Sequence, residues 1–204
     1  MQIIDLTQTI VHGMQVYPGD EPPSLEQINS LEKDTFTNHR FSTGMHAGTH
    51  IDGPWHMVGD KRFIADSPLD YFIGKASVID IRNTSVFRDA SLVKEKASGC
   101  SIVLFYTGMG EKFGTPQYLA DYPLVGEQIA EVCVEMGIKL LGIDTLSPDV
   151  APHETHKILL GNGVLIAENL CNLHLLLDKN DIEVIALPLK IAADSAPARI
   201  IARV

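Results

Sequence analysis

The stretch MHAGTHIDGPWHM, residues 45–57, contains three of the eight histidines of the chain within eleven positions. An even spread of the eight histidines over 204 residues would place only about 0.4 in such a window, so the cluster is unlike incidental surface histidines. Gly48, Gly53 and Pro54 disfavour a helix here, because glycine and proline disrupt helices. We therefore expect an extended chain, in which successive side chains point to opposite faces.

This extended chain predicts a metal site. His46, His50 and Asp52 are separated by even numbers of residues, so their side chains would share one face. The turn that follows would let His56 fold back over them. Imidazole and carboxylate groups are ligands that suit zinc, manganese and iron.

A second cluster of the same residue types begins at His153. It offers His153, His156 and Glu168. Glu168 lies in the apolar run VLIAENL, and a buried carboxylate is costly unless it is paired or binds a metal. A Glu168 exposed at the edge of a sheet is the alternative. The residues alone do not separate His153 from His156, since either could flank the start of a helix.

Composition limits the function classes. The 204 residues, 45% of them hydrophobic, suffice for one domain over residues 1–204 with a sizeable core. A net charge of -10 and no dense Lys/Arg cluster argue against nucleic-acid binding. We find neither a signal-peptide pattern nor an apolar run near the roughly 20 residues of a membrane span. Cys100, Cys133 and Cys171 form no disulfide framework, so we expect reduced thiols and a cytoplasmic protein.

Short apolar runs alternate along the chain with segments whose apolar residues are spaced as in a helix. Strands are expected at residues 2–6, 76–81, 101–107, 138–144, 164–170 and 182–189. Helices are expected at residues 124–137, with Gly137 as a C-terminal cap, and at 153–160. Residues 7–75 carry few regular signals, which is typical of a functional segment. The alternation predicts an α/β fold with a mainly parallel or mixed sheet.

With these residues the chain resembles the cyclase-type metal-dependent hydrolases, a family that includes bacterial kynurenine formamidases and isatin hydrolases. The family motif HxGTHxDxPxH is complete over residues 46–56. Four further matches are PGD at 18–20, GIDT at 142–145, ENL at 168–170, and the C-terminal series PLK at 188–190, Asp194 and PAR at 197–199. The resemblance therefore covers nearly the whole chain, in separate islands.

The resemblance implies a binuclear metal centre. Its ligands would be His46, His50, Asp52, His156 and Glu168, holding two zinc ions per chain or manganese in their place. Asp52 and Glu168 would bridge the ions, and His156 rather than His153 would be the second histidine cluster's ligand. His56 would be the catalytic acid/base, a role for which an unperturbed histidine pKa of about 6.5 is well placed.

The resemblance also implies a fold, an assembly and a substrate. The fold would be a single α/β domain with a central mixed sheet or barrel-like core and outer helices, assembled as a homodimer or homotetramer. The reaction would cleave a C–N amide bond of a small molecule, foremost N-formyl-L-kynurenine. The family's formamidases carry Trp before the PGD turn, against the aromatic substrate, whereas this chain has Tyr17. Tyr17 can still stack on a ring, and a cyclic amide such as an isatin-like lactam is the alternative substrate.

Two other function classes use the same residue types. Two histidines and one carboxylate also form the facial triad of mononuclear iron oxygenases, although the second cluster and His56 argue against it. A non-catalytic protein that keeps a metal for stability would leave His56 without a role. Among the neighbours, Trp55 is a second candidate for the substrate wall or for packing. Thr49 is expected to stabilise the turn, and Asp144 either supports a histidine ligand or holds a loop.

Overall fold

One eight-stranded sheet closes on itself and forms a barrel at the centre of the computed structural model, which describes residues 1–204. Around the barrel the strands are β12 (Ser195–Arg203), β11 (Ile182–Pro188), β5 (Ile73–Asp80), β7 (Ile102–Tyr106), β9 (Leu140–Ile143), β10 (Leu165–Glu168) and β4 (His50–Asp52). Strand β4 pairs with β12 and closes the ring, and β1 (Ile3–Asp5) adds to the same side of β12. The run from β5 to β10 is parallel and the other pairings are antiparallel, so the mixed, barrel-like α/β core is confirmed.

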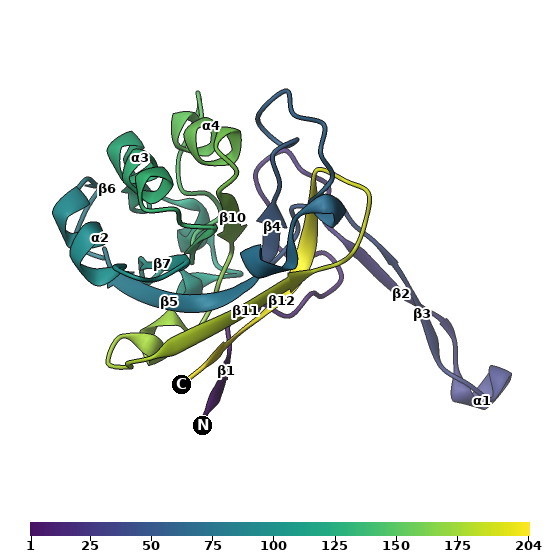
Figure 1. Ribbon diagram of the computed structural model, residues 1–204. Coiled ribbons are helices and arrows are strands. Elements are labelled where there is room, and N and C mark those ends of the chain that lie inside the picture. The colour runs from purple at the N-terminus through teal and green to yellow at the C-terminus, as the bar shows by residue number, and fades with distance from the viewer.

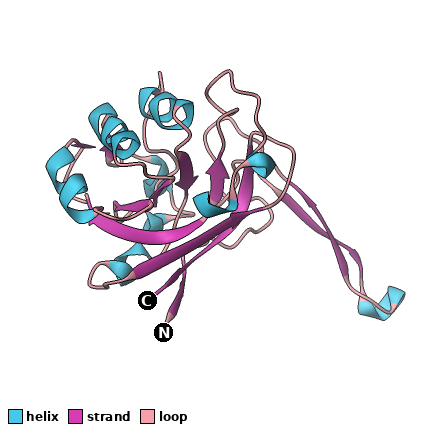
Figure 2. Ribbon diagram, viewed as in Figure 1, coloured by secondary structure: helices cyan, strands magenta, loops and turns pink.

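Three helices lie side by side along the outside of the parallel strands (Figure 1). They are α2 (Ala90–Lys96), α3 (Glu127–Glu135) and α4 (Glu154–Gly161). Figure 2 shows these helices gathered on one flank of the sheet. Short 3-10 helices occupy Ile64–Asp66, Leu69–Tyr71, Gly110–Lys112, Pro116–Leu119 and Leu173–Leu176. None of the helices has the length and apolar character that crossing a bilayer requires.

The barrel wall separates two apolar cores. Every residue of β7 is buried, and its side chains alternate between the two sides. Ile102, Leu104 and Tyr106 join the core inside the barrel, whereas Val103 and Phe105 join the core under the helices. A strand that is buried on both faces reads as a continuous apolar run, which is why the sequence identifies it.

The expected elements are largely confirmed, with shifted ends. The helix expected at residues 124–137 begins only at Glu127, because residues 124–125 form the short strand β8 (Leu124–Val125), paired with β6 (Val86–Phe87). Gly137 follows the helix with a φ of 72°, as expected of a C-terminal cap. Strand β12 was not expected, since Pro197 removes a backbone donor and interrupts the strand signal.

An arm leaves the body of the molecule within the segment that carried few signals. It is an antiparallel hairpin of β2 (Ser24–Asn29) and β3 (Asn38–Ser42), with α1 (Leu31–Asp34) at its outer end. Figure 1 shows the arm projecting away from the barrel. All of β3 is exposed, and so are the apolar side chains of Leu25, Ile28, Leu31, Phe36 and Phe41.

The closure of the barrel requires a glycine after β4. The Gly53 N–H donates to the Asp194 carbonyl at 2.9 Å, and a Cβ on Gly53 would lie 2.6 Å from that oxygen. We predict that Gly53→Ala lowers the free energy of unfolding by about 2 kcal/mol, because backbone must move to remove the clash. Urea unfolding of the metal-stripped protein measures the change.

Gly44→Ala is the matched control, since a Cβ there meets nothing within 4 Å and its backbone does not need glycine. Its effect should be below about 1 kcal/mol and is expected to be stabilising. Equal effects of the two substitutions would show that the contact at the barrel closure is unimportant.

Candidate metal centre

Strand β4 lies between β10 and β12, and this register brings the central polar residues together. His50 pairs with Glu168 of β10, and Asp52 pairs with Ser195 of β12. His50 Nε2 lies 3.3 Å from Glu168 Oε2 and 3.4 Å from Asp52 Oδ1. All three side chains are buried. Glu168 is therefore not an edge-exposed residue, and the argument from its apolar surroundings is confirmed.

His46 reaches this cluster from a turn rather than from a strand. The expectation of an extended chain is right for residues 50–52 and wrong for residues 45–49, which form turns and bends. Gly48 has a φ of 66°, a conformation that favours glycine, and so the chain reverses there. His46 nevertheless meets Asp52, with 2.9 Å between Nδ1 and Oδ1. Its Nε2 lies 3.0 Å from Asp194 Oδ2.

His56 folds back over the cluster, as the turn after β4 predicts. Its N–H donates to the Gly53 carbonyl at 3.1 Å. The His56 ring centroid lies 4.1 Å from that of His46 and 6.0 Å from that of His156. Its Nδ1 is 3.5 Å from Asp194 Oδ2, so one carboxylate stands beside both His46 and His56.

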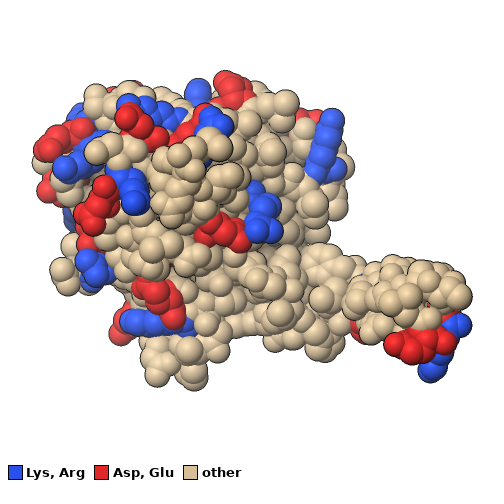
Figure 3. Space-filling view, turned by 90° about the horizontal axis from the view of Figure 1, so that it is seen from below, with Lys and Arg blue, Asp and Glu red and all other residues tan.

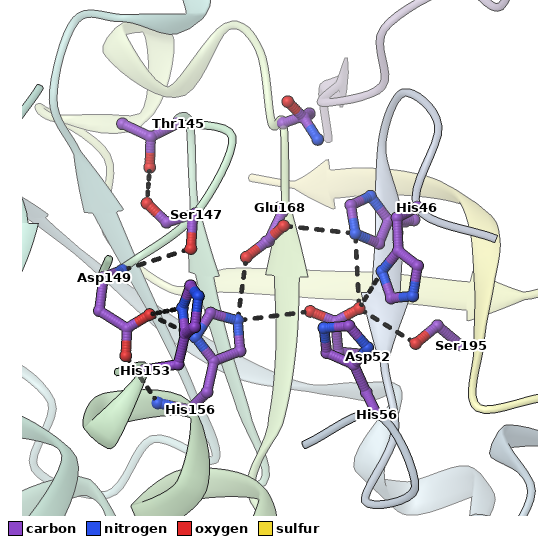
Figure 4. Close-up of polar contacts among 12 residues, drawn as sticks. His46, Asp52, His56, Thr145, Ser147, Asp149, His153, His156, Glu168 and Ser195 are labelled. Carbon is purple, nitrogen blue, oxygen red and sulfur yellow. Dashed lines mark hydrogen bonds and ion pairs between the residues drawn. The ribbon is translucent and has the colours of Figure 1, made fainter. Parts of the chain in front are cut away.

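His156 and His153, the two histidines of the second cluster, differ in their contacts (Figure 4). His156 Nε2 points to the centre, 3.3 Å from Glu168 Oε1 and 3.8 Å from Asp52 Oδ2. On its other side, His156 Nδ1 donates to Asp149 Oδ1 at 2.6 Å. His153 forms no ion pair with Glu168 or Asp52, and its Nδ1 donates to the same Asp149 oxygen at 2.9 Å.

Three buried atoms at the centre fit a bound cation. His50 Nε2, Asp52 Oδ2 and Glu168 Oε1 have no hydrogen-bond partner. An unsatisfied buried polar group costs about 1–3 kcal/mol, and more when it is charged, so three in one place need an explanation. His50 Nδ1 donates to the Gly48 carbonyl at 2.8 Å, which leaves the Nε2 lone pair directed at the carboxylates. Histidine nitrogen and carboxylate oxygen are the donor set of zinc and manganese sites.

In the metal-free protein, the buried carboxylates likewise favour positive charge on the histidines beside them. Burial opposes a charged His46, but hydrogen bonds to Asp194 and Asp52 raise its pKa to about 9. Burial likewise opposes a charged His156, but the hydrogen bond to Asp149 and the negative charge of Glu168 raise its pKa to about 10. His56 differs, because burial lowers its pKa and the nearby His46 adds to the effect. His56 is therefore neutral at pH 7 and able to accept a proton.

A cavity of about 200 Å³ opens onto the cluster. Five histidines, Glu168 and Tyr17 are among the residues that line it, so Tyr17 shares one cavity with the cluster. Trp55 does not line this cavity and packs against Phe63, with 5.4 Å between ring centroids. Thr49 donates to the Asn169 carbonyl at 2.7 Å and so stabilises the turn. Asp144 holds a loop, since it accepts from the N–H and hydroxyl groups of Thr107.

Three supporting residues were not assigned a role from the sequence. Asp149 and Asp194 hold the outer sides of the histidine rings, and Ser195 donates to Asp52 Oδ1 at 3.1 Å. Asp194 belongs to the C-terminal series that matches the family, but the match assigned no function to this residue. Asp149 lies seven residues before His156 in a loop, a spacing that predicts no contact.

Comparisons with known proteins show that the chain is similar to cyclases and hydrolases. A family model described as "Putative cyclase" matches residues 4–150. A kynurenine formamidase from Bacillus cereus is 31% identical over 98% of this chain and 96% of its own length. A solved structure described as a predicted metal-dependent hydrolase from Bacillus stearothermophilus is 28% identical, covers 98% of this chain and 97% of that chain, and has a TM-score of 0.78. Isatin hydrolase A from Labrenzia aggregata bound to benzyl benzoate has a TM-score of 0.88 over 98% of this chain and 93% of its own, at 22% identity, and shares the fold.

The raised histidine pKa values predict how the stability of the metal-stripped protein depends on pH. The pKa values of folded His46 and His156, about 9 and about 10, lie above the ordinary histidine pKa of 6.5. Their protonation therefore stabilises the folded state fully below pH 6.5, and this contribution is lost as the pH rises through 9 and 10. Urea unfolding across this window should show a falling free energy of unfolding.

The metal-loaded protein is the control for other groups that titrate at high pH. A bound metal requires unprotonated imidazole nitrogens, so its affinity rises with pH and offsets the fall. Parallel pH profiles for the stripped and loaded proteins would contradict the interpretation.

Proposed function

The chain belongs to the cyclase family and is a metal-dependent amide hydrolase, and we propose that it cleaves the formamide of N-formyl-L-kynurenine to give L-kynurenine and formate. The observation that carries the proposal is the set of unpartnered buried atoms of His50, Asp52 and Glu168 beneath a cavity lined by His56 and Tyr17. The kynurenine formamidase of Bacillus cereus supports the choice of substrate, since the two chains align over nearly their full lengths.

We assign the metal ligands from their positions in this cluster. His46, His50 and Asp52 would hold one divalent ion and His156 a second, and the carboxylates of Asp52 and Glu168 would serve both. The contacts of His156 Nε2 with Glu168 and Asp52 support this arrangement. Two zinc ions are proposed, and manganese accepts the same donors. A divalent ion bound there supplies a Lewis acid and lowers the pKa of water from 15.7 to about 7.

The residues around the cluster divide the remaining work. His56 is neutral at pH 7, so it would accept a proton from the attacking water and return it to the departing nitrogen. Asp194, 3.5 Å from His56 Nδ1, would hold the ring and stabilise the charge that develops on it. Tyr17 would stack on the aryl ring of the substrate.

We do not favour the lactam as substrate. The isatin hydrolase structure is only 22% identical, and that likeness is one of fold. The iron oxygenase and the non-catalytic protein are not favoured either, because neither explains a neutral His56 placed over both groups of candidate ligands.

The proposed function is tested by following N-formyl-L-kynurenine hydrolysis by absorbance, with and without EDTA. We expect rapid turnover that EDTA abolishes and that added zinc or manganese restores, which would place the enzyme in tryptophan breakdown. Isatin serves as the comparison substrate under the same conditions. No turnover of the formamide by protein with a measured metal content would reject the substrate.

Two variants separate metal binding from proton transfer in this assay. His56→Ala should retain its metal and lose at least about 100-fold in kcat, the usual contribution of a general acid/base. Asp52→Ala should lose metal and stability together. Loss of metal from both variants would contradict the division of roles.

We also propose that copies of the chain associate as a homodimer or homotetramer, through the arm formed by β2, β3 and α1. An isolated two-stranded hairpin is marginally stable in water, and this one buries almost nothing against its own body. Seen from below, the arm stands clear of the body, and its charged side chains gather at its outer end (Figure 3). Its exposed leucines and phenylalanines would pack on a second copy, which makes the contact self-complementary.

Light scattering during gel filtration tests the association. The protein should have the mass of a dimer or tetramer, and Leu31→Glu on the arm should shift it towards the monomer. Leu69→Glu, on an equally exposed leucine of the body, is the control and should leave the mass unchanged. A monomeric wild-type protein would overturn the proposal.

We further propose a cytoplasmic location. Cys100, Cys133 and Cys171 are all free thiols, which suits a reducing compartment.

A further inference from the structure

One oxygen of Asp149 binds two histidine rings at once. Asp149 Oδ1 lies 2.6 Å from His156 Nδ1 and 2.9 Å from His153 Nδ1. The second oxygen of Asp149 accepts a hydrogen bond from the backbone N–H of His156 at 3.0 Å. The two rings are nearly perpendicular, with 5.6 Å between their centroids. Asp149 is buried, and its hydrogen bonds fix the positions of both rings.

The hydrogen bonds to Asp149 fix which nitrogen of each ring carries a proton. A carboxylate can only accept hydrogen bonds, so both Nδ1 atoms must be donors. In a neutral imidazole the other nitrogen, Nε2, is then an acceptor. His156 directs its Nε2 at Glu168 and Asp52 in the candidate metal centre. His153 carries the same acceptor, but no protein group hydrogen-bonds to it.

His153 is placed at the cavity at a conformational cost. It lines the cavity together with His56 and Tyr17. Its φ of 61° and ψ of 45° are left-handed, which is uncommon for a residue other than glycine. The residue precedes α4, yet its side chain does not cap the helix. The ring is therefore held by Asp149 for a purpose other than starting the helix.

We propose that His153 contacts the substrate and that its Nε2 accepts a hydrogen bond from the N–H of the scissile amide. This inference rests on the proposed function. The ring stands next to that of His156, and so beside the place where the reacting carbonyl would meet the metal centre. An acceptor there favours amides that carry an N–H over esters, which present an oxygen with no hydrogen at the same position. His153 would thus be a specificity-determining residue, and Asp149 the residue that positions it.

Two variants at this position isolate the acceptor. Asn overlays the Nδ1 half of a histidine, so His153→Asn can keep the hydrogen bond to Asp149 while it removes Nε2. Asn is also among the residues that best tolerate the left-handed conformation, which protects the fold. His153→Gln does the reverse, because its longer side chain places an acceptor oxygen near the Nε2 position and gives up the bond to Asp149.

The test compares formanilide with phenyl formate, which differ only in an N–H or an oxygen at the scissile bond. His153→Asn should lower kcat/KM for formanilide about tenfold, the size of one hydrogen bond, and leave phenyl formate within about twofold. His153→Gln should recover part of the preference for the amide. Metal content and unfolding midpoints should match the wild type in His153→Asn, since the ligand cluster is untouched.

Each outcome separates the inference from the function on which it rests. Equal losses on the two substrates, or no loss on either, would overturn the role of His153 and leave the proposed function standing. A wild-type enzyme that holds its metal but hydrolyses neither compound would overturn both. A fall in metal affinity in His153→Asn would show that His153 supports the metal centre instead of the substrate.

Discussion

The closure of the barrel places uncompensated polar atoms in the interior, and the rest of the site is arranged around them. Strand β4 has only three residues, yet it joins β10 to β12 and supplies both His50 and Asp52. With Glu168 across the register, the closure leaves one nitrogen and two carboxylate oxygens buried without partners. Water-free carboxylates need positive charge. Protonated imidazoles provide it in the metal-free protein, and divalent ions would provide it in the active one.

Carboxylates outside the cluster also contact its histidines. Asp194 contacts the outer nitrogen of His46, and Asp149 contacts the outer nitrogen of His156. In each case the carboxylate orients the ring and makes its inner nitrogen a stronger donor to a metal. Asp194 also lies beside His56, so in the proposed mechanism one carboxylate would support both ligand orientation and proton transfer. The two sides of the centre are therefore held alike, by aspartates from two different loops in the C-terminal part of the chain.

The sequence predicts the parts of this structure that depend on local patterns. The parallel strands were identifiable because both of their faces are apolar, and Glu168 stood out because a charge interrupts such a run. The extended chain expected through His46 was wrong, because Gly48 adopts a left-handed conformation and Met14 occupies the space beside it, a contact that no local pattern reveals. Strand β12 was missed because Pro197 masks it. The roles of Asp149 and Asp194 were out of reach, because both act through contacts that follow from tertiary structure.

The order of strands along the chain has a consequence for how the protein forms. Strand β12 comes after every other barrel strand, yet it lies against β4, and the hydrogen bond from Ser195 to Asp52 spans 143 residues. During synthesis the ribosome must deliver β12 before β4 gains its second neighbour. Contacts between such distant segments slow folding, because a large loop must close before they form. Until then Asp52 lacks its hydrogen bond from Ser195, and the barrel stays open at β4. The topology thus ties the closure of the barrel around the candidate metal centre to the synthesis of β12.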